Sequence, residues 1–216
     1  MSDHNKAEFD DIAAGWYNFR HYTIFGYELT SLAERWGGGK LLNAGCGHGA
    51  DFIPFKGRFH LFGIDLSSEM LKYARKYAAK HEFTVELTQA DIRSLPFPDN
   101  YFDNIIGVAS FHHIKGRPEQ IKALQELKRV LRPEGELFLT VWNARQPKFW
   151  CTRRDTFIPW RTGSKIVNRF YHLFTYGEIK ILLRRAGFEI LLVHPESNYK
   201  GLFKYFSRNI CVLTKK

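Results

Sequence analysis

Cysteine is scarce in this sequence, and long apolar runs are missing. The 216 residues include three cysteines, Cys46, Cys151 and Cys211. An odd number of widely spaced cysteines argues against a disulfide framework and against a zinc site, and is typical of a reducing cytoplasm. No apolar run approaches the roughly 20 residues that a bilayer span requires. The polar start, MSDHNK, contains no hydrophobic signal core. We therefore expect a cytoplasmic protein with no membrane segment and no metal.

Acidic residues are scarce in the last third of the chain. Residues 144–216 hold 15 Lys/Arg and 4 Asp/Glu, a net charge of +11, whereas residues 1–143 hold 17 and 18, a net charge of −1. With 44% hydrophobic and 25% charged residues, the composition is otherwise that of an ordinary globular protein of one domain. The basic third is either a solvated face or a footprint for a polyanion such as nucleic acid.

A buried strand that runs into a glycine-rich turn is the motif around which the chain is organised. The segment Leu41–Gly49 reads LLNAGCGHG. Glycine at positions 45, 47 and 49 permits positive φ and lets a ligand approach the backbone closely. In open α/β sheets, nucleotide-like ligands bind at such a turn at the carboxyl end of the first parallel strand. Taken alone, the motif is also compatible with a plain turn.

Strand-like and helix-like segments alternate after this turn. We expect strands near 60–65, 83–87, 102–109, 136–142, 188–193 and 209–213, and helices near 66–79, 118–130 and 175–186. This alternation predicts a doubly wound α/β sheet. The loop between the last two strands is too short for a crossover helix, so the last strand should return antiparallel. Residues 5–36 should form helices that cap the ligand site, and residues 144–170, which show no clear period, an inserted loop.

Two acids follow the second and third predicted strands. Asp65 lies 20 residues beyond Gly45 and can accept both hydroxyls of a ribose, or it can cap the next helix. Asp91 can accept the exocyclic amine of an adenine while Ile92 packs on the ring, or it can cap a loop.

These motifs, together with the segment Leu127–Gly135 (LKRVLRPEG), resemble those of class I S-adenosylmethionine-dependent methyltransferases. The resemblance implies a Rossmann-like fold: a seven-stranded, mostly parallel sheet with an antiparallel last strand and helices on both faces. It also implies S-adenosylmethionine as cofactor. The cofactor-binding residues would be Gly45, Cys46, Gly47, Asp65, Leu66, Asp91, Ile92 and Ala109. The family commonly has an acid where this sequence has Asn43, which can still hydrogen-bond the turn but carries no charge.

A narrower set of motifs resembles the tRNA wobble-uridine carboxyl methyltransferases. These motifs are Phe9–Ala13 with Arg20-His21, His112-His113, Ala123–Leu127, Val141–Asn143, Asn168–Phe174 (NRFYHLF), Gly177–Ile179 and Arg208–Leu213. The resemblance implies methyl esterification of a carboxymethyl group on the uridine at the first position of the tRNA anticodon. Several members of this family need a small zinc-ribbon activator subunit.

Candidate substrate contacts follow from the nature of a carboxylate acceptor. A carboxylate is ionised at neutral pH, so its methylation requires no strong base. Arg20, Arg169 and His172 are candidates for gripping the carboxylate or a phosphate, and Tyr171 for stacking on a flipped-out uridine. If Arg20 and Arg169 do not bind substrate, we expect each to form a surface ion pair.

Several roles stay open at this point. For His112 and His113 there are two alternatives. One of them packs against the lid or orients the cofactor loop, or one of them takes part directly in catalysis. Trp150, Phe157 and Trp160 form either a local hydrophobic cluster or a platform for base stacking.

We expect one methyltransferase domain over residues 1–216. It would comprise an N-terminal helical lid (1–37), a cofactor-binding core (38–143), a basic substrate-side insertion (144–174) and a C-terminal helix with a strand pair (175–216). Two alternative functions remain: a methyltransferase of small molecules, such as a quinone precursor or a carboxylic acid, and a non-catalytic member that binds the cofactor.

Overall fold

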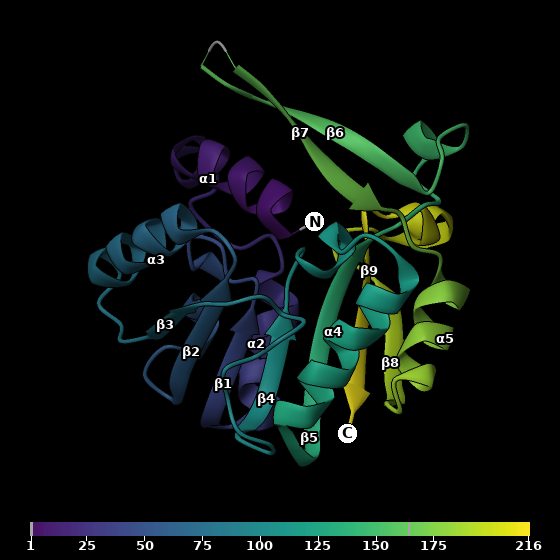
Figure 1. Cartoon of the computed structure of the whole chain (residues 1–216). Coiled ribbons are helices and arrows are strands. Elements are labelled where there is room, and N and C mark those ends of the chain that lie inside the picture. The colour runs from purple at the N-terminus through teal and green to yellow at the C-terminus, as the bar shows by residue number, and fades with distance from the viewer. Residues whose placement is uncertain (1, 164) are drawn as a thin grey trace.

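A seven-stranded sheet forms the centre of the structure, a computed structural model that describes residues 2–163 and 165–216 (Figure 1). The strand order is β3-β2-β1-β4-β5-β9-β8, and β9 runs antiparallel to both of its neighbours while the other pairs are parallel. The strands are β1 (Gly39–Ala44), β2 (Phe59–Asp65), β3 (Glu86–Gln89), β4 (Phe102–Gly107), β5 (Leu131–Trp142), β8 (Glu189–Pro195) and β9 (Asn209–Lys215). The predicted fold class and antiparallel last strand are thereby confirmed.

Helices cover both faces of the sheet because successive strand residues alternate between the faces. Leu42 and Ile105 belong to the core cluster that α4 and α5 complete, whereas Leu41 and Ile106 pack on the side of α2 and α3. The helices of these layers are α2 (Gly26–Trp36), α3 (Ser68–Lys80), α4 (Arg117–Val130) and α5 (Tyr176–Arg185), with a short 3₁₀ helix, η1 (Ala50–Phe55), after the glycine turn.

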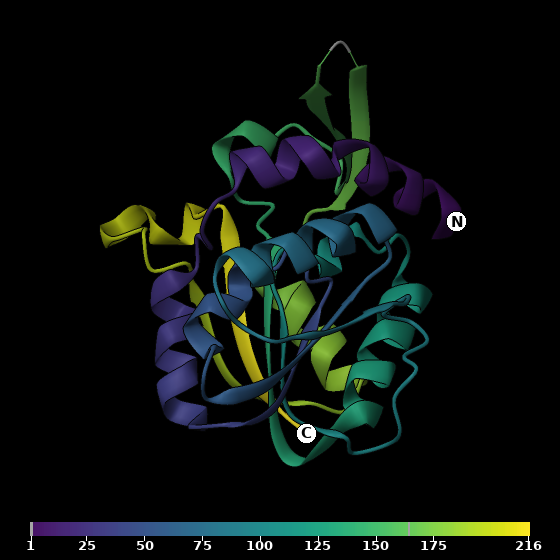
Figure 2. The same ribbon diagram turned by 90° about the vertical axis from the view of Figure 1, so that its left-hand side faces the viewer.

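The N-terminal helix α1 (Ser2–Phe19) lies across the carboxyl ends of the parallel strands, beside α3 (Figure 2). Its anchor is Asp10, whose carboxylate accepts hydrogen bonds from the Ser67 hydroxyl (2.6 Å) and the Glu69 N–H (3.2 Å) at the start of α3. A carboxylate at a helix N-terminus satisfies free N–H groups and opposes the helix dipole. The position of α1 over the sheet edge is therefore fixed by a specific polar contact.

The expectation of an inserted loop at 144–170 is wrong for most of this segment. A β-hairpin of β6 (Asp155–Thr162) and β7 (Lys165–His172) lies there instead. The hairpin projects from the end of the sheet that α1 covers (Figure 1). Alternate residues of β6 are exposed, as in a strand of period two, but the exposed set includes the apolar Phe157. Pro159 further obscured the pattern, since proline is tolerated only on an edge strand such as this one.

None of the described helices is long and apolar enough to cross a membrane. Within residues 2–163 and 165–216, no group of three or more His, Cys, Asp or Glu side chains is arranged to hold a metal ion.

Candidate active site

A cavity of about 330 Å³ lies at the carboxyl ends of the parallel strands, next to α1 and β7. All eight residues predicted to bind the cofactor line it: Gly45, Cys46, Gly47, Asp65, Leu66, Asp91, Ile92 and Ala109. Three of the four predicted substrate contacts, Arg20, Arg169 and Tyr171, line it as well, whereas His172 does not. Residues of both predicted sets therefore meet in one cavity.

The glycine turn after β1 has a geometry that requires glycine at position 45. Gly45 has a φ of +80°, and a Cβ there would lie 2.4 Å from the Cβ of Ser110. The N–H groups of Gly45 and Cys46 both donate to the Ile64 carbonyl, at 2.9 and 2.8 Å. By contrast, a Cβ on Gly47 would meet nothing within 4 Å. The turn is thus held from behind and open toward the cavity, as a backbone cradle for a ligand must be.

Asp65 links this turn to α3. Its carboxylate accepts hydrogen bonds from the N–H groups of Gly47 (2.8 Å) and Ser67 (2.9 Å). Burial raises the pKa of Asp65, and these N–H groups offset part of that rise. The cap of α3 is Ser67, whose hydroxyl accepts the N–H of Met70 at 3.0 Å. Asp65 retains lone pairs for ribose hydroxyls, because each carboxylate oxygen can accept two hydrogen bonds.

Asp91 caps its own loop and pairs with Arg93. It accepts the backbone N–H of Arg93 (3.0 Å) and the Arg93 guanidinium, with the shortest contact at 2.5 Å. Burial acts to raise the pKa of Asp91, but the hydrogen bonds and charge of Arg93 lower it on balance. The loop-capping alternative is thus realised, and Asp91 and Ile92 still line the cavity where an adenine is predicted.

Asn43 does not make the contact expected of it. The side chain is buried, and both Nδ2 and Oδ1 have no hydrogen-bond partner within the described chain. It is not part of the cavity wall. The turn is held by the Ile64 carbonyl and Asp65 instead.

Ala109 adopts an uncommon backbone conformation at the end of β4. Its φ is +51°, which is rare for a residue other than glycine. The Thr140 hydroxyl accepts its N–H at 2.9 Å. Strained backbone of this kind concentrates at functional sites, and Ala109 is the residue predicted to lie beside the sulfonium.

Aromatic rings and arginines form the wall of the cavity opposite the glycine turn. Tyr171 is buried between the rings of His112, stacked at a centroid distance of 4.9 Å, and Trp142, at 4.3 Å. The guanidinium of Arg169, 4% exposed, lies 5.3 Å from the Tyr171 ring centroid. The charges of Arg169, Arg20 and Arg208 all act on the Tyr171 hydroxyl.

Two arginines of this wall have buried N–H donors without a hydrogen-bond partner within the described chain. These donors are the Nε–H groups of Arg20 and Arg169. Burial lowers the pKa of Arg169, and the nearby Tyr171 and Glu8 counter that shift. A buried guanidinium with free donors favours an anionic ligand.

His112 and His113 are both uncharged at neutral pH. Burial holds the pKa of His112 well below its usual range and lowers that of His113 to about 3, with nearby Arg169 adding to both shifts. The Nδ1–H of His113 donates to the Phe170 carbonyl at 2.7 Å, and its ring packs on Phe9 of α1 at 4.8 Å. His113 therefore packs against the helix that covers the site, one of the roles expected for this pair.

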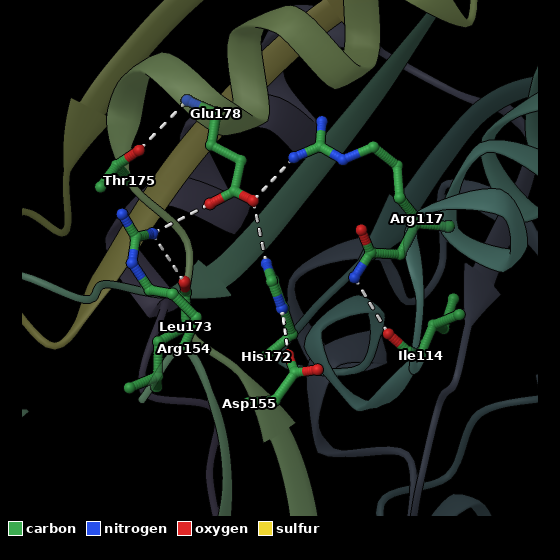
Figure 3. Close-up of polar contacts among 9 residues, drawn as sticks. Ile114, Arg117, Arg154, Asp155, His172, Leu173, Thr175 and Glu178 are labelled. Atoms are coloured by element: carbon green, nitrogen blue, oxygen red, sulfur yellow. Dashed lines mark hydrogen bonds and ion pairs between the residues drawn. The ribbon is translucent and has the colours of Figure 1, made fainter. Parts of the chain in front are cut away.

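His172 is the last residue of β7 and does not line the cavity; Figure 3 shows it between Asp155 and Glu178. Its Nδ1 contacts Asp155 at 2.5 Å and its Nε2 contacts Glu178 at 3.1 Å. Glu178 also accepts hydrogen bonds from Arg117 (2.9 Å) and Arg154 (3.0 Å). Burial acts to lower the pKa of His172, but the two carboxylates raise it on balance. The expected grip on substrate is therefore not available to His172, which instead joins the hairpin to α5.

Asp51 and Arg208 also line the cavity, although the sequence analysis did not propose either as a site residue. Asp51, on η1, faces the cavity near Cys46 and Arg20, and its pKa is raised to about 6, chiefly by burial. Arg208 precedes β9, which starts opposite the end of β5 because Trp142 pairs with Asn209. An antiparallel last strand brings its first residues to the carboxyl edge of the sheet, so the predicted topology already contained the signal for Arg208.

Comparison with known proteins gives consistent matches over this core. Residues 42–139 match the family model described as a methyltransferase domain. A protein of Encephalitozoon cuniculi (strain GB-M1) that carries the name of a methyltransferase is 30% identical over 159 residues, which is 70% of each chain. The CcbJ methyltransferase from Streptomyces caelestis superposes with a TM-score of 0.78 at 15% identity, over 97% of this chain and 98% of that chain.

Several of the matching relatives carry names that refer to tRNA. The "Probable tRNA methyltransferase 9B" of Bos taurus is 30% identical over 129 residues, 60% of this chain and 27% of that protein. The tRNA (carboxymethyluridine(34)-5-O)-methyltransferase of Arabidopsis thaliana is 31% identical over 109 residues, 50% of this chain and 25% of that protein. The chain thus spans about a quarter of the length of these two relatives.

Proposed function

Because this chain belongs to the S-adenosylmethionine-dependent methyltransferases, we propose that it methylates a carboxylate, namely the carboxymethyl group of the wobble uridine in tRNA. The observation that carries the proposal is the group of three arginines, Arg20, Arg169 and Arg208, around Tyr171 in the cavity. It supplies positive charge where an acceptor would bind.

The residues on the glycine-turn side of the cavity fit the cofactor. In this proposal Gly45, Cys46 and Gly47 cradle its methionine part, and Asp65 with Leu66 holds the ribose. The adenine lies against Asp91 and Ile92, and the sulfonium end beside Ala109. When bound, S-adenosylmethionine supplies a methyl group that a nucleophile can take directly. The residues of the protein orient the two reactants and exclude water from them.

The wall of the cavity around Tyr171 is better suited to an acceptor that is already an anion than to one that must lose a proton. A general base works best when its pKa lies near the operating pH. The pKa of His113 in this wall is about 3, whereas Asp51, with a pKa of about 6, lies on the glycine-turn side of the cavity. Burial raises the pKa of Tyr171, so its hydroxyl keeps its proton at neutral pH. A carboxylate needs no deprotonation there, and arginine binds it through paired N–H donors. The free donors of Arg20 and Arg169 support this choice of acceptor.

A basic and aromatic rim outside the cavity supports RNA as the carrier of that carboxylate. Lys148 lies 4.9 Å from the ring centroid of Trp142, which itself contacts Tyr171 in the cavity wall. Trp150 is exposed, and its indole N–H donates to the Arg145 carbonyl at 3.0 Å. Unstacked RNA bases bind to aromatic rings and phosphates to Lys and Arg. We therefore assign residues 144–174 to the substrate side and residues 1–37 to a lid. The names of the two tRNA-related relatives agree with this assignment.

A small carboxylic acid is the second candidate acceptor. The arguments for an anionic acceptor apply to it equally. The observation in its favour is that α1 covers the cavity and contributes Phe9 and Trp16 to its wall. A small acid would pass such a lid more easily than an anticodon loop, unless α1 moves.

Nucleoside mass spectrometry separates the two candidates. The protein is incubated with methyl-labelled S-adenosylmethionine and bulk tRNA from cells that lack it, with and without a small zinc-ribbon subunit of the kind the family resemblance implies. We expect the labelled methyl ester of carboxymethyluridine to appear as carboxymethyluridine declines. Label confined to small acids in a parallel extract, with none in tRNA under either condition, would favour the second candidate.

A further inference from the structure

Three carboxylates face the cavity, and their partners differ. Asp65 accepts two backbone N–H groups, and Asp91 is paired with Arg93. Asp51 has a hydrogen bond with the hydroxyl of Thr23, and no ion pair within 4.0 Å in the part of the chain that the structure describes. It is therefore the cavity carboxylate with the weakest compensation from the protein itself.

A carboxylate in this position favours a cation that arrives with a ligand. Removing an ionised carboxylate from water costs free energy unless a counter-charge or several hydrogen bonds replace the lost hydration. The positive charge of Arg20 acts on Asp51. Arg20 is itself one of three neighbouring arginines, with Arg169 and Arg208, whose charges act on Tyr171 on another side of the cavity. The negative charge of Asp51 is therefore only partly compensated by the protein.

The place of Asp51 identifies which cation fits. Asp51 is the second residue of η1, directly after the glycine turn, and its charge acts on the thiol of Cys46. Cys46 belongs to the segment that we propose to cradle the methionine part of the cofactor. That part carries an α-ammonium group with three N–H donors. The uncharged Asn43 lies outside the cavity wall and is not placed to serve this group.

We propose that Asp51 binds the α-ammonium group of S-adenosylmethionine through its carboxylate. Asp51 is supplied by η1, directly after the glycine turn. This assignment rests on the cofactor site and not on the identity of the methyl acceptor. The competing role for Asp51 is a structural one, in which it holds Arg20 and with it the end of α1.

A double-mutant cycle by isothermal titration calorimetry tests the contact. The ligands are S-adenosylhomocysteine and its deamino analogue, which lacks only the amine, and the proteins are wild type, Asp51→Asn, and Asp99→Asn as an exposed control. We expect Asp51→Asn to weaken S-adenosylhomocysteine about 10- to 100-fold, the range for a lost charge-assisted hydrogen bond. The deamino analogue should bind Asp51→Asn as well as it binds wild type, within about twofold. Asp99→Asn should change neither affinity.

Three results would overturn the proposal. Equal weakening of both ligands by Asp51→Asn would assign Asp51 to the structure of the turn and lid. Unchanged affinity for S-adenosylhomocysteine would remove Asp51 from the cofactor site. If Asp51→Asn does not fold, equal affinity of wild type for the two ligands would refute the contact, and a 10- to 100-fold preference for the amine would support it. Because no acceptor is present, failure of the tRNA proposal would leave these titrations unaffected.

Discussion

Replacing His172 with glutamine should destabilise the protein without disturbing the cofactor site. His172 is 14% exposed in its side chain and joins Asp155 of β6 to Glu178 of α5. A hydrogen bond to a charged partner contributes about 1.5–3 kcal/mol, and the contact with Asp155 must be discounted because that side chain is 51% exposed. Glu178 keeps Arg117 and Arg154, and Asp155 is exposed enough to be solvated, so no buried carboxylate is left unpaired. We expect a loss of about 2 kcal/mol, or about 4–8 °C in Tm.

The pH dependence of this loss follows from the raised pKa of His172. A group whose pKa is raised on folding stabilises the folded state fully below its ordinary value, here near 6.5. That stabilisation is lost as the pH rises through the raised value. The difference in unfolding free energy between wild type and His172→Gln, measured by urea denaturation, should therefore be largest near pH 6 and narrow toward pH 9. The matched control is Lys165→Gln. Lys165 lies on the same hairpin, and its replacement removes an exposed ion pair with Asp11 of α1, which should lower the free energy of unfolding by less than about 1 kcal/mol.

Two results would refute this reasoning. A difference in stability that does not change with pH would show that protonated His172 does not join the hairpin to α5. Normal stability combined with a large rise in KM for the acceptor would return His172 to the role in substrate binding that the sequence suggested.

Three further predictions concern the cavity. Asp65→Ala should abolish measurable binding of S-adenosylhomocysteine in calorimetry, because the carboxylate positions the turn and, in the proposed binding mode, holds the ribose; unchanged binding would contradict the cofactor site. Arg169→Gln should spare that binding but lower kcat/KM for the acceptor about 100-fold, the loss of roughly one charge-assisted contact, whereas loss of both would make Arg169 structural. Gly45→Ala should destabilise the protein by about 3 kcal/mol or more in urea denaturation, since its Cβ would overlap Ser110 at a positive φ; Gly47→Ala, with no such overlap, should cost only about 1 kcal/mol.

The cofactor side of the molecule could be predicted because its signals are local. The order of strands and helices, the glycine turn and the acids that end strands follow from short-range periodicity and spacing. The third strand was placed slightly early, at 83–87, whereas β3 spans Glu86–Gln89.

The substrate side depends on contacts between distant segments, which no local pattern records. The hairpin β6–β7 was missed because Phe157 is exposed and Pro159 interrupts the strand pattern. Asp51 lines the cavity close to Thr23 and Arg20, which are distant from it in the sequence. His172 was taken for a ligand contact because sequence cannot show that Asp155 and Glu178 already occupy both of its ring nitrogens.

The alkali lability of the transferred methyl group tests the proposed chemistry most directly. After reaction of the protein with methyl-labelled S-adenosylmethionine and tRNA, the recovered RNA is treated with mild alkali and the volatile label is counted. A methyl ester hydrolyses to methanol under these conditions, whereas methyl groups on base carbon, base nitrogen or ribose oxygen remain bound. We expect the label to leave as methanol, and to accumulate about 100-fold more slowly in tRNA treated with Arg169→Gln. Label that stays on the RNA through alkali would contradict the assignment of a carboxylate acceptor.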